Sequence, residues 1–194
     1  SGAAGAKRIY DVIDQPIEIQ NEEKLPDLNT KEGKIRFSEV SFKYESSNDK
    51  AINNINLDIS GGTMAAFVGH SGAGKSTIIN LLPRFYDPQK GEIFIDEQNT
   101  KFVNLKSLRK NISLVSQDII LLDSSIKENI LYANPSASEQ DLENSCRFAA
   151  AEEFIEKLPE KYETKIGENG VRLSGGQKQR LSIARAILKK SPII

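Results

Sequence analysis

Several residue types are nearly missing from this 194-residue chain, which has one cysteine, one methionine, one histidine and no tryptophan. The single cysteine, Cys146, cannot form an internal disulfide bond. The first residues also lack the basic-then-apolar pattern of a secretory signal. A reducing, cytosolic setting is therefore expected.

Long apolar runs and a charge excess are also lacking. The longest apolar runs are only a handful of residues, too short for a membrane span. Lys and Arg total 26 against 27 for Asp and Glu, a net charge of -1, so no broad basic surface for nucleic acid is expected. The 38% hydrophobic and 27% charged residues predict a globular chain of one domain, with or without appendages.

The N-terminal region differs in composition from the rest. Residues 3–14 are Ala-rich, and Ile9, Val12 and Ile13 share one helical face, which predicts the end of a helix before Pro16. Residues 17–33 lack periodicity and indicate a linker. The predicted organisation is a helix end and linker over 1–33 and a folded domain over 34–194.

An alternation of strands, glycines and helices follows. Residues 35–44 alternate with a phase slip, which predicts a bulged strand or strand pair, and residues 55–59 alternate again. Residues 64–68 are apolar at every position, as in a strand buried on both faces at the centre of a parallel sheet. A helix over 75–85 and a strand over 92–96 complete an α/β pattern.

The second half is predominantly helical. A strand is predicted over 112–115, and capping-box spacing at Ser125 and Ser138 predicts helices within 124–158, inside a helical subdomain of about 118–172. Ser174 is expected to cap a last helix running to about Lys190. Residues 192–194 resemble the start of another buried strand.

The segment after the apolar run has the spacing of a phosphate-binding loop. Its backbone N–H groups can surround phosphates, Lys75 adds a positive charge, and the Ser76 hydroxyl can bind Mg²⁺. A chance match to the four fixed positions has odds below about one in a hundred, so a mere glycine turn beside a lysine is a poor alternative. The segment is Gly69, His70, Ser71, Gly72, Ala73, Gly74, Lys75 and Ser76.

A second candidate anion site begins the last helix, at Ser174, Gly175, Gly176 and Gln177. On its own this segment fits a capped turn as well as a binding site. Together with a phosphate loop, it suggests two surfaces for one polyphosphate ligand.

With these motifs, residues 34–194 resemble the ATP-binding domain of ABC transporters. Gly69–Thr77 is similar to the Walker A loop, and Leu173–Gln177, continuing to Ala186, to the signature loop and its helix. Gln117 matches the Q-loop glutamine and Tyr44 the aromatic residue that stacks on adenine. Residues 164–170 resemble the X-loop of exporters.

The resemblance implies ATP and Mg²⁺ as cofactors. It gives catalytic roles to Lys75 and Gln117, metal contacts to Ser76 and Gln117, and nucleotide contacts to Tyr44, to Gly69–Thr77, to Gln117 and to Ser174–Gln177. Without the family, Tyr44 would be assigned to strand packing and Gln117 to an ordinary polar position. His70 stands at a variable loop position and receives no catalytic role, and Cys146 is expected to be a packed thiol.

One departure from the family stands out. The Walker B aspartate, the adjacent glutamate and the switch histidine would follow the strand that begins at Pro192, and the sequence stops at Ile194. We therefore expect weak hydrolysis by this chain alone and hypothesise that it is a piece of a longer polypeptide.

The implied fold is α/β: a P-loop NTPase core with a parallel sheet, a small antiparallel β subdomain and a helical subdomain. The implied function is ATP hydrolysis driving export, with a head-to-tail second copy and a membrane-spanning domain as partners, at the cytoplasmic face of the membrane. Two alternatives remain: a module that dimerises on ATP without turnover, and a soluble ABC ATPase of translation or DNA repair. The exporter-like X-loop argues against the latter, and so does the helix end over residues 1–16, which the resemblance implies to be the end of the last membrane-domain helix.

Overall fold

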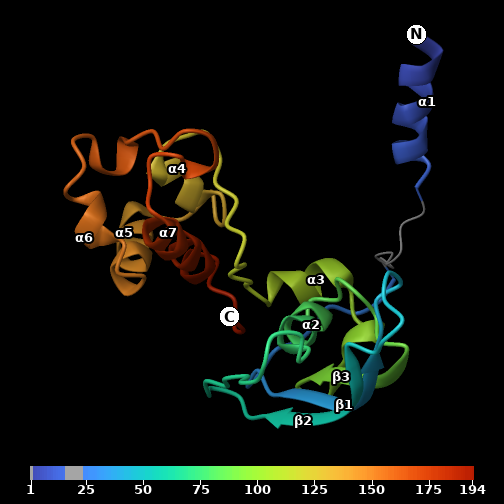
Figure 1. Ribbon diagram of the computed structural model, residues 1–194. Coiled ribbons are helices and arrows are strands. Elements are labelled where there is room, and N and C mark those ends of the chain that lie inside the picture. The colour runs from blue at the N-terminus through green and yellow to red at the C-terminus, as the bar shows by residue number, and fades with distance from the viewer. Residues whose placement is uncertain (1, 16–23) are drawn as a thin grey trace. The chain divides into compact units, whose positions relative to one another are not determined.

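A computed structural model describes residues 2–15 and 24–194 of the chain. It contains two compact units, Ser1–Leu108 and Arg109–Ile194, called unit 1 and unit 2 below. Figure 1 labels their helices and strands. Residues 16–23, which hold Pro16 and part of the predicted linker, lie outside the described residues. The predicted boundary at 33/34 and the predicted subdomain at about 118–172 stay predictions.

Unit 1 is built on a four-stranded antiparallel sheet. The strands are β1 (Ile35–Phe42), β2 (Ile52–Ile59), β3 (Lys90–Ile95) and β4 (Gln98–Asn99), in the order β2-β1-β3-β4. Helix α2 (Lys75–Leu81) lies over this sheet in Figure 1 and buries Thr77, Ile78 and Leu81. A 3-10 turn, η1 (Thr100–Phe102), follows the last strand. The predicted antiparallel β subdomain is confirmed.

The predicted phase slip in the first strand is a β-bulge. Phe37 pairs with Leu57 and Val40 with Ile55, so one extra residue stands on β1 between these pairs. Glu39 takes a φ of 50° there, and its N–H donates to Asn56 Oδ1 at 3.0 Å. The bulge keeps Phe37 and Val40 both buried despite their odd spacing.

The prediction of a buried strand over Met64–Val68 is wrong for this structure. The segment has no regular secondary structure, and Met64 and Val68 are 99% and 92% exposed. A strand forms only when its backbone N–H and C=O groups find a neighbouring strand, and none of the described strands pairs with residues 64–68. An apolar run shows which residues favour burial, but it does not show whether a neighbouring strand is available to pair with them.

The predicted parallel sheet is likewise not formed among the described residues. Their one parallel pairing is a single bridge between Ile112 and Ile193, in unit 2. The Ser113 N–H donates to the carbonyl of Ile193 at 2.8 Å, and the Ile193 N–H donates to that of Asn111 at 3.2 Å. The segments predicted as strands at 112–115 and 192–194 therefore meet, over one bridge.

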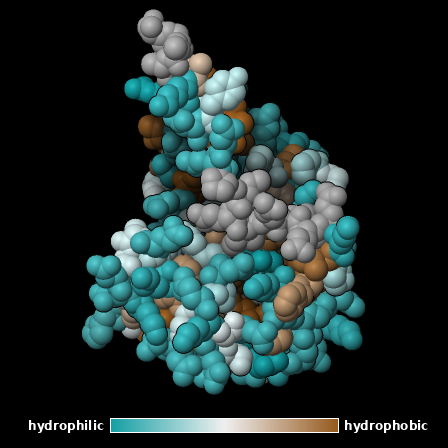
Figure 2. All heavy atoms as spheres, turned by 90° about the vertical axis from the view of Figure 1, so that its right-hand side faces the viewer, coloured by the Kyte–Doolittle hydropathy of each residue, from teal (hydrophilic) through white to brown (hydrophobic). Residues whose placement is uncertain are grey.

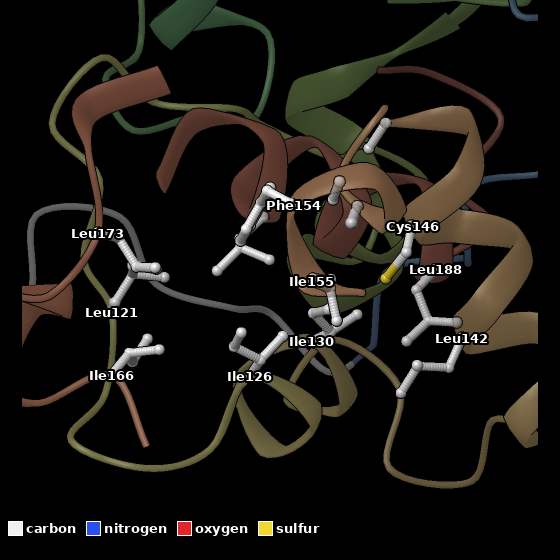
Figure 3. Close-up of a cluster of buried hydrophobic side chains, with 14 residues drawn as sticks. Leu121, Ile126, Ile130, Leu142, Cys146, Phe154, Ile155, Ile166, Leu173 and Leu188 are labelled. Carbon is white, nitrogen blue, oxygen red and sulfur yellow. The ribbon is translucent and has the colours of Figure 1, made fainter. Parts of the chain in front are cut away.

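Unit 2 is helical. It contains α4 (Ile126–Leu131), α5 (Glu139–Phe148), α6 (Glu152–Ile155) and α7 (Gly175–Leu188), with short 3-10 turns η2 (Lys161–Glu163) and η3 (Glu168–Gly170), and α3 (Leu105–Lys110) crosses the boundary between the units. Figure 3 shows the side chains of its core converging from these helices and from the loops at Leu121, Ile166 and Leu173. Cys146 is fully buried in this core, which confirms the packed thiol, and burial raises its pKa to about 11.

Serine side chains cap three helices of unit 2, α4, α5 and α7, as predicted. Ser125 and Ser174 each form a complete capping box, with Glu128 and Gln177 respectively. The Ser138 side chain accepts the N–H of Asp141. Each cap satisfies backbone N–H groups that a helix start otherwise leaves unpaired.

The surface agrees with the composition. The face in Figure 2 is largely hydrophilic, with hydrophobic residues scattered among polar ones. Helix α1 (Gly2–Ile13) forms where the alanine-rich pattern predicted a helix, and Ile9, Val12 and Ile13 on its apolar face are all exposed. Among the described helices, none has the length and apolar character needed to cross a bilayer.

Asp96 fastens the segment before β1 to the sheet. Its carboxylate accepts four consecutive backbone N–H groups, those of residues 31–34, at 2.6 to 3.1 Å. Partial burial alone would raise the pKa of Asp96, but the four hydrogen bonds outweigh it and hold the pKa below its ordinary value of 3.8. The folded state therefore stabilises the charged carboxylate of Asp96 relative to its protonated form, more than the unfolded state does.

We expect Asp96→Asn to destabilise unit 1 by about 1–2 kcal/mol at neutral pH, because an amide oxygen accepts these hydrogen bonds less strongly than a carboxylate. The folded-state pKa is lowered, so this stabilisation is fully present above about pH 4 and is lost as the pH falls through the folded-state pKa. Thermal unfolding between pH 2 and 7 measures it. Glu97→Gln, which removes an exposed ion pair with Arg36, is the control, and an equal effect of both variants would contradict the assignment.

Candidate functional site

The glycine-rich loop of unit 1 takes backbone conformations that favour glycine. Gly72 and Gly74 have φ values of 81° and 85°, and Gly74 immediately precedes α2. A Cβ at Gly74 would lie 2.5 Å from the carbonyl oxygen of Ala51, where β2 begins, whereas a Cβ at Gly72 would meet no described atom within 4 Å. Gly74 is therefore required by close packing as well as by its φ value.

The ammonium group of Lys75 lies against the same loop. Lys75 Nζ donates to the carbonyl oxygens of Gly69 at 2.9 Å and His70 at 2.7 Å. The Ala73 N–H also turns back to the carbonyl of His70, at 3.2 Å. The predicted residues Gly69–Lys75 thus form one closed turn around a positive charge, with Ser76 exposed in the first turn of α2.

Tyr44 lies beside α2. Its hydroxyl and that of Thr77 are hydrogen-bonded at 3.1 Å, and its ring packs edge-on against Phe42 and Tyr86, with centroids 4.8 and 5.1 Å away. The structure therefore brings Tyr44 and Thr77, two predicted site residues 33 positions apart, into contact. The ring contacts agree with the packing role that the local sequence favoured, and the residue is partly exposed.

The remaining predicted residues belong to unit 2. Ser174 and Gln177 close the capping box of α7: Ser174 Oγ accepts the Gln177 N–H at 3.3 Å, and Gln177 Oε1 accepts the Ser174 N–H at 2.9 Å. Gly175 and Gly176 form the first turn with ordinary helical φ values, and no described atom lies within 4 Å of a Cβ at either position. Contacts within the described chain therefore do not explain these two glycines.

Gln117 lies exposed in a bend next to a cavity of about 350 Å³. Its neighbours Ser116 and Asp118 line this cavity, together with Arg185 and Lys189 of α7. Ser113 also lines it, and its buried hydroxyl has no hydrogen-bond partner among the described residues. The site predicted from the sequence is thus divided between the units, with Tyr44 and Gly69–Thr77 in unit 1 and Gln117 and Ser174–Gln177 in unit 2.

Sequence reasoning missed two residues that organise unit 2, Asn129 and Arg185. Asn129 is fully buried in α4, and Arg185 of α7 donates to its carbonyl at 2.6 Å and also to its side-chain oxygen. Each polar residue interrupts an apolar helical stripe, Asn129 beside Ile130 and Arg185 between Leu181 and Leu188. A polar residue at a position that periodicity assigns to the core was the signal available.

The described residues offer few protein ligands for a magnesium ion. Among the described residues, no group of three or more His, Cys, Asp or Glu side chains could hold a metal ion. The exposed hydroxyl of Ser76 stands directly after Lys75, where it could contribute one oxygen ligand.

We expect Gly74→Ala to lower the melting temperature more than Gly72→Ala. Both substitutions introduce the strain of a left-handed conformation, about 1–2 kcal/mol, but the Gly74 variant also pushes a methyl group against the Ala51 carbonyl. Thermal unfolding of the two purified variants beside the unsubstituted chain measures the difference. Equal melting temperatures would show that the close approach to β2 is not essential.

Comparison with known proteins shows the family of this chain. The family model described as "ABC transporter" matches residues 52–194. "ABC transporter B family member 2" of Dictyostelium discoideum is 46% identical over 197 residues, covering 100% of this chain and 14% of that protein. A Staphylococcus aureus (strain NCTC 8325 / PS 47) protein named for multidrug export, an ATP-binding/permease protein, is 46% identical over 186 residues, covering 96% of this chain and 32% of its own length.

A solved structure gives the same result in three dimensions. A bacterial Atm1-family ABC exporter with ATP bound superposes with a TM-score of 0.91 at 38% identity, covering 99% of this chain and 34% of the exporter chain. The chain thus spans about a third or less of the length of these relatives. It belongs to the ABC transporter family, as an ATPase domain with the P-loop NTPase fold.

Proposed function

We propose that this chain is the part of an ABC exporter that binds and hydrolyses ATP and thereby drives transport across a membrane. The observation that carries the proposal is the closed turn Gly69–Gly74 around Lys75 at the start of α2, in a chain whose relatives include a multidrug export ATP-binding/permease protein. The loop fits a polyphosphate, because its ammonium group and backbone N–H groups supply positive charge and donors.

In unit 1, the proposed ligand is the triphosphate of ATP with its adenine near Tyr44. Lys75 would exchange its hydrogen bonds to the Gly69 and His70 carbonyls for phosphate oxygens, which are stronger acceptors because they are charged. Ser76 would hold Mg²⁺, which would neutralise phosphate charge, and Thr77 would keep Tyr44 in place through their hydroxyl contact. Gln117 is proposed to orient water and contact the metal in the assembled site.

In unit 2, Ser174–Gln177 is proposed to grip the ATP held by a second copy of the chain. The two glycines support this role, because contacts within the described chain do not explain them and a close ligand would. Two copies related head to tail would then share two nucleotides. The membrane-spanning partner, and a position at the cytoplasmic face of the membrane, are proposed from the names of the relatives.

The charge of Lys75 tests ATP binding. We expect Lys75→Ala to weaken binding of a fluorescent ATP analogue by tenfold or more, since a charge-assisted contact contributes about 1.5–3 kcal/mol. Lys101→Ala, which removes an exposed lysine of unit 1 away from the loop, is the matched control and should bind normally. Phosphate release by the same proteins separates turnover from binding alone: equal background rates with and without Lys75 would favour a module that binds ATP without hydrolysing it.

The glycines of the signature segment test the second surface. We expect Gly176→Ala to leave the melting temperature unchanged or slightly higher, because alanine is favoured over glycine in a helix by up to about 1 kcal/mol and the position is open. The same variant should load ATP normally but lose ATP-dependent dimerisation, measured by light scattering without Mg²⁺. Ser136→Ala, at an exposed serine before α5, is the control, and normal dimerisation of the Gly176 variant would contradict the proposed contact.

A further inference from the structure

Arg185 and Asn129 connect two parts of unit 2 that the proposed function uses separately. Arg185 Nη1 donates to the carbonyl of Ile120 at 2.6 Å, while its Nε donates to the Asn129 carbonyl at 2.6 Å. Its Nη2 donates to Asn129 Oδ1. One guanidinium group thus binds α4 and the segment three residues beyond Gln117.

Asn129 continues the connection to the same segment. Its side-chain oxygen accepts the Leu122 N–H at 2.9 Å, and its side-chain nitrogen donates to the Leu122 carbonyl at 3.0 Å. The same nitrogen also donates to Ser124 Oγ and to the Ser125 carbonyl. Residues 120–122 are thereby fixed at three backbone atoms, by two side chains from two helices.

Two further contacts among the described residues hold this segment: the Leu121 side chain is buried in the core, and the Ser124 N–H donates to the Leu122 carbonyl at 2.8 Å. The segment has no regular secondary structure, and Ile120 and Leu122 are 72% and 45% exposed on either side of the buried Leu121. Arg185 makes no ion pair with a carboxylate among the described residues, and burial lowers its pKa. A half-buried guanidinium paired only with neutral oxygens is costly, and here its three donating nitrogens are all used to hold backbone and amide oxygens in place.

Helix α7 links Arg185 to the Ser174–Gln177 segment. This helix begins with Gly175 directly after Ser174, and Arg185 stands about three turns further along the same rigid element. Any displacement of residues 120–122, which begin three residues beyond Gln117, must therefore either carry α7 and its signature segment with it or break these hydrogen bonds. We infer that Arg185 and Asn129 are positioning residues that fix Gln117 and the Ser174–Gln177 segment relative to each other, so that the two act on nucleotide as one body.

This inference rests on the proposed function for its consequence, but its structural part can be measured without nucleotide. In the complete 194-residue chain, amide hydrogen exchange of residues 118–123 should be faster by about tenfold or more in Arg185→Ala, because the Leu122 N–H donates to Asn129 Oδ1, which Arg185 holds in place. Arg185→Lys keeps the charge but can donate to fewer of the acceptors, so its exchange rate should lie between those of the unsubstituted chain and Arg185→Ala. The lysine variant also replaces the alanine variant in the test if the latter does not fold.

Two controls separate positioning from stability. Arg180→Ala removes another α7 arginine, which donates to the Ala150 carbonyl at 3.1 Å, and Ile155→Val trims the same core. Neither should speed exchange at 118–123, even where the melting temperature falls as much as in Arg185→Lys. Exchange at 118–123 that rises no more in the Arg185 variants than in these controls would overturn the inference.

The functional arm uses ATP loading and ATP-dependent dimerisation of the same proteins. We expect the Arg185 variants to load ATP within about twofold of the unsubstituted chain but to dimerise about tenfold more weakly, because the signature segment is no longer held in register with Gln117. Faster exchange with unchanged dimerisation would overturn the positioning role. If the unsubstituted chain neither loads ATP nor dimerises, the proposed function fails, while the exchange comparison still decides whether Arg185 fixes the segment.

Discussion

The pairing of buried polar groups between Asn129 and Arg185 is the interaction on which unit 2 depends. A fully buried amide and a half-buried guanidinium are each unfavourable alone, because both give up hydrogen bonds to water. Together they use each other and the backbone of residues 120–125, so the cost is offset only when α4, α7 and this segment are all in place. Burial of the apolar side chains shown in Figure 3 favours packing of the helices, and these hydrogen bonds limit the arrangements in which they can pack.

In unit 1, backbone contacts fix how the elements pack against one another. The start of α2 approaches β2 so closely that Gly74 has no room for a side chain against the Ala51 carbonyl, and the approach fixes where the loop and Lys75 stand relative to the sheet. Asp96 does for residues 31–34 what a helix cap does elsewhere, collecting four backbone N–H groups on one carboxylate. Residues 64–68, whose backbone groups meet no described strand, show the converse: apolar side chains alone do not make a strand.

What the sequence revealed in advance was local. The phase slip in β1 and the caps at Ser125 and Ser174 each depend on residues a few positions apart, and each is found as predicted. The interactions that the sequence did not reveal join residues that lie far apart along the chain. Asp96 binds N–H groups 62 to 65 residues away, and Arg185 binds backbone 56 to 65 residues away, and no pattern within one element encodes such pairs. The roles of the site residues came from resemblance, because a single exposed glutamine such as Gln117 has no local signature of function.

The glycines of the chain separate into those that the fold explains and those that it does not. Gly74 is required by a neighbouring carbonyl, Gly91 by the backbone of β1, and Gly72 by its positive φ. Gly175 and Gly176 satisfy neither condition, although glycine weakens a helix start relative to alanine. The serine cap does not explain them either, since Ser125 and Ser138 cap their helices with isoleucine and glutamate in the first position. The place of Gly175 and Gly176 at the start of α7, next to the positive end of the helix dipole, supports the proposal that this segment faces a phosphate group from outside the described chain.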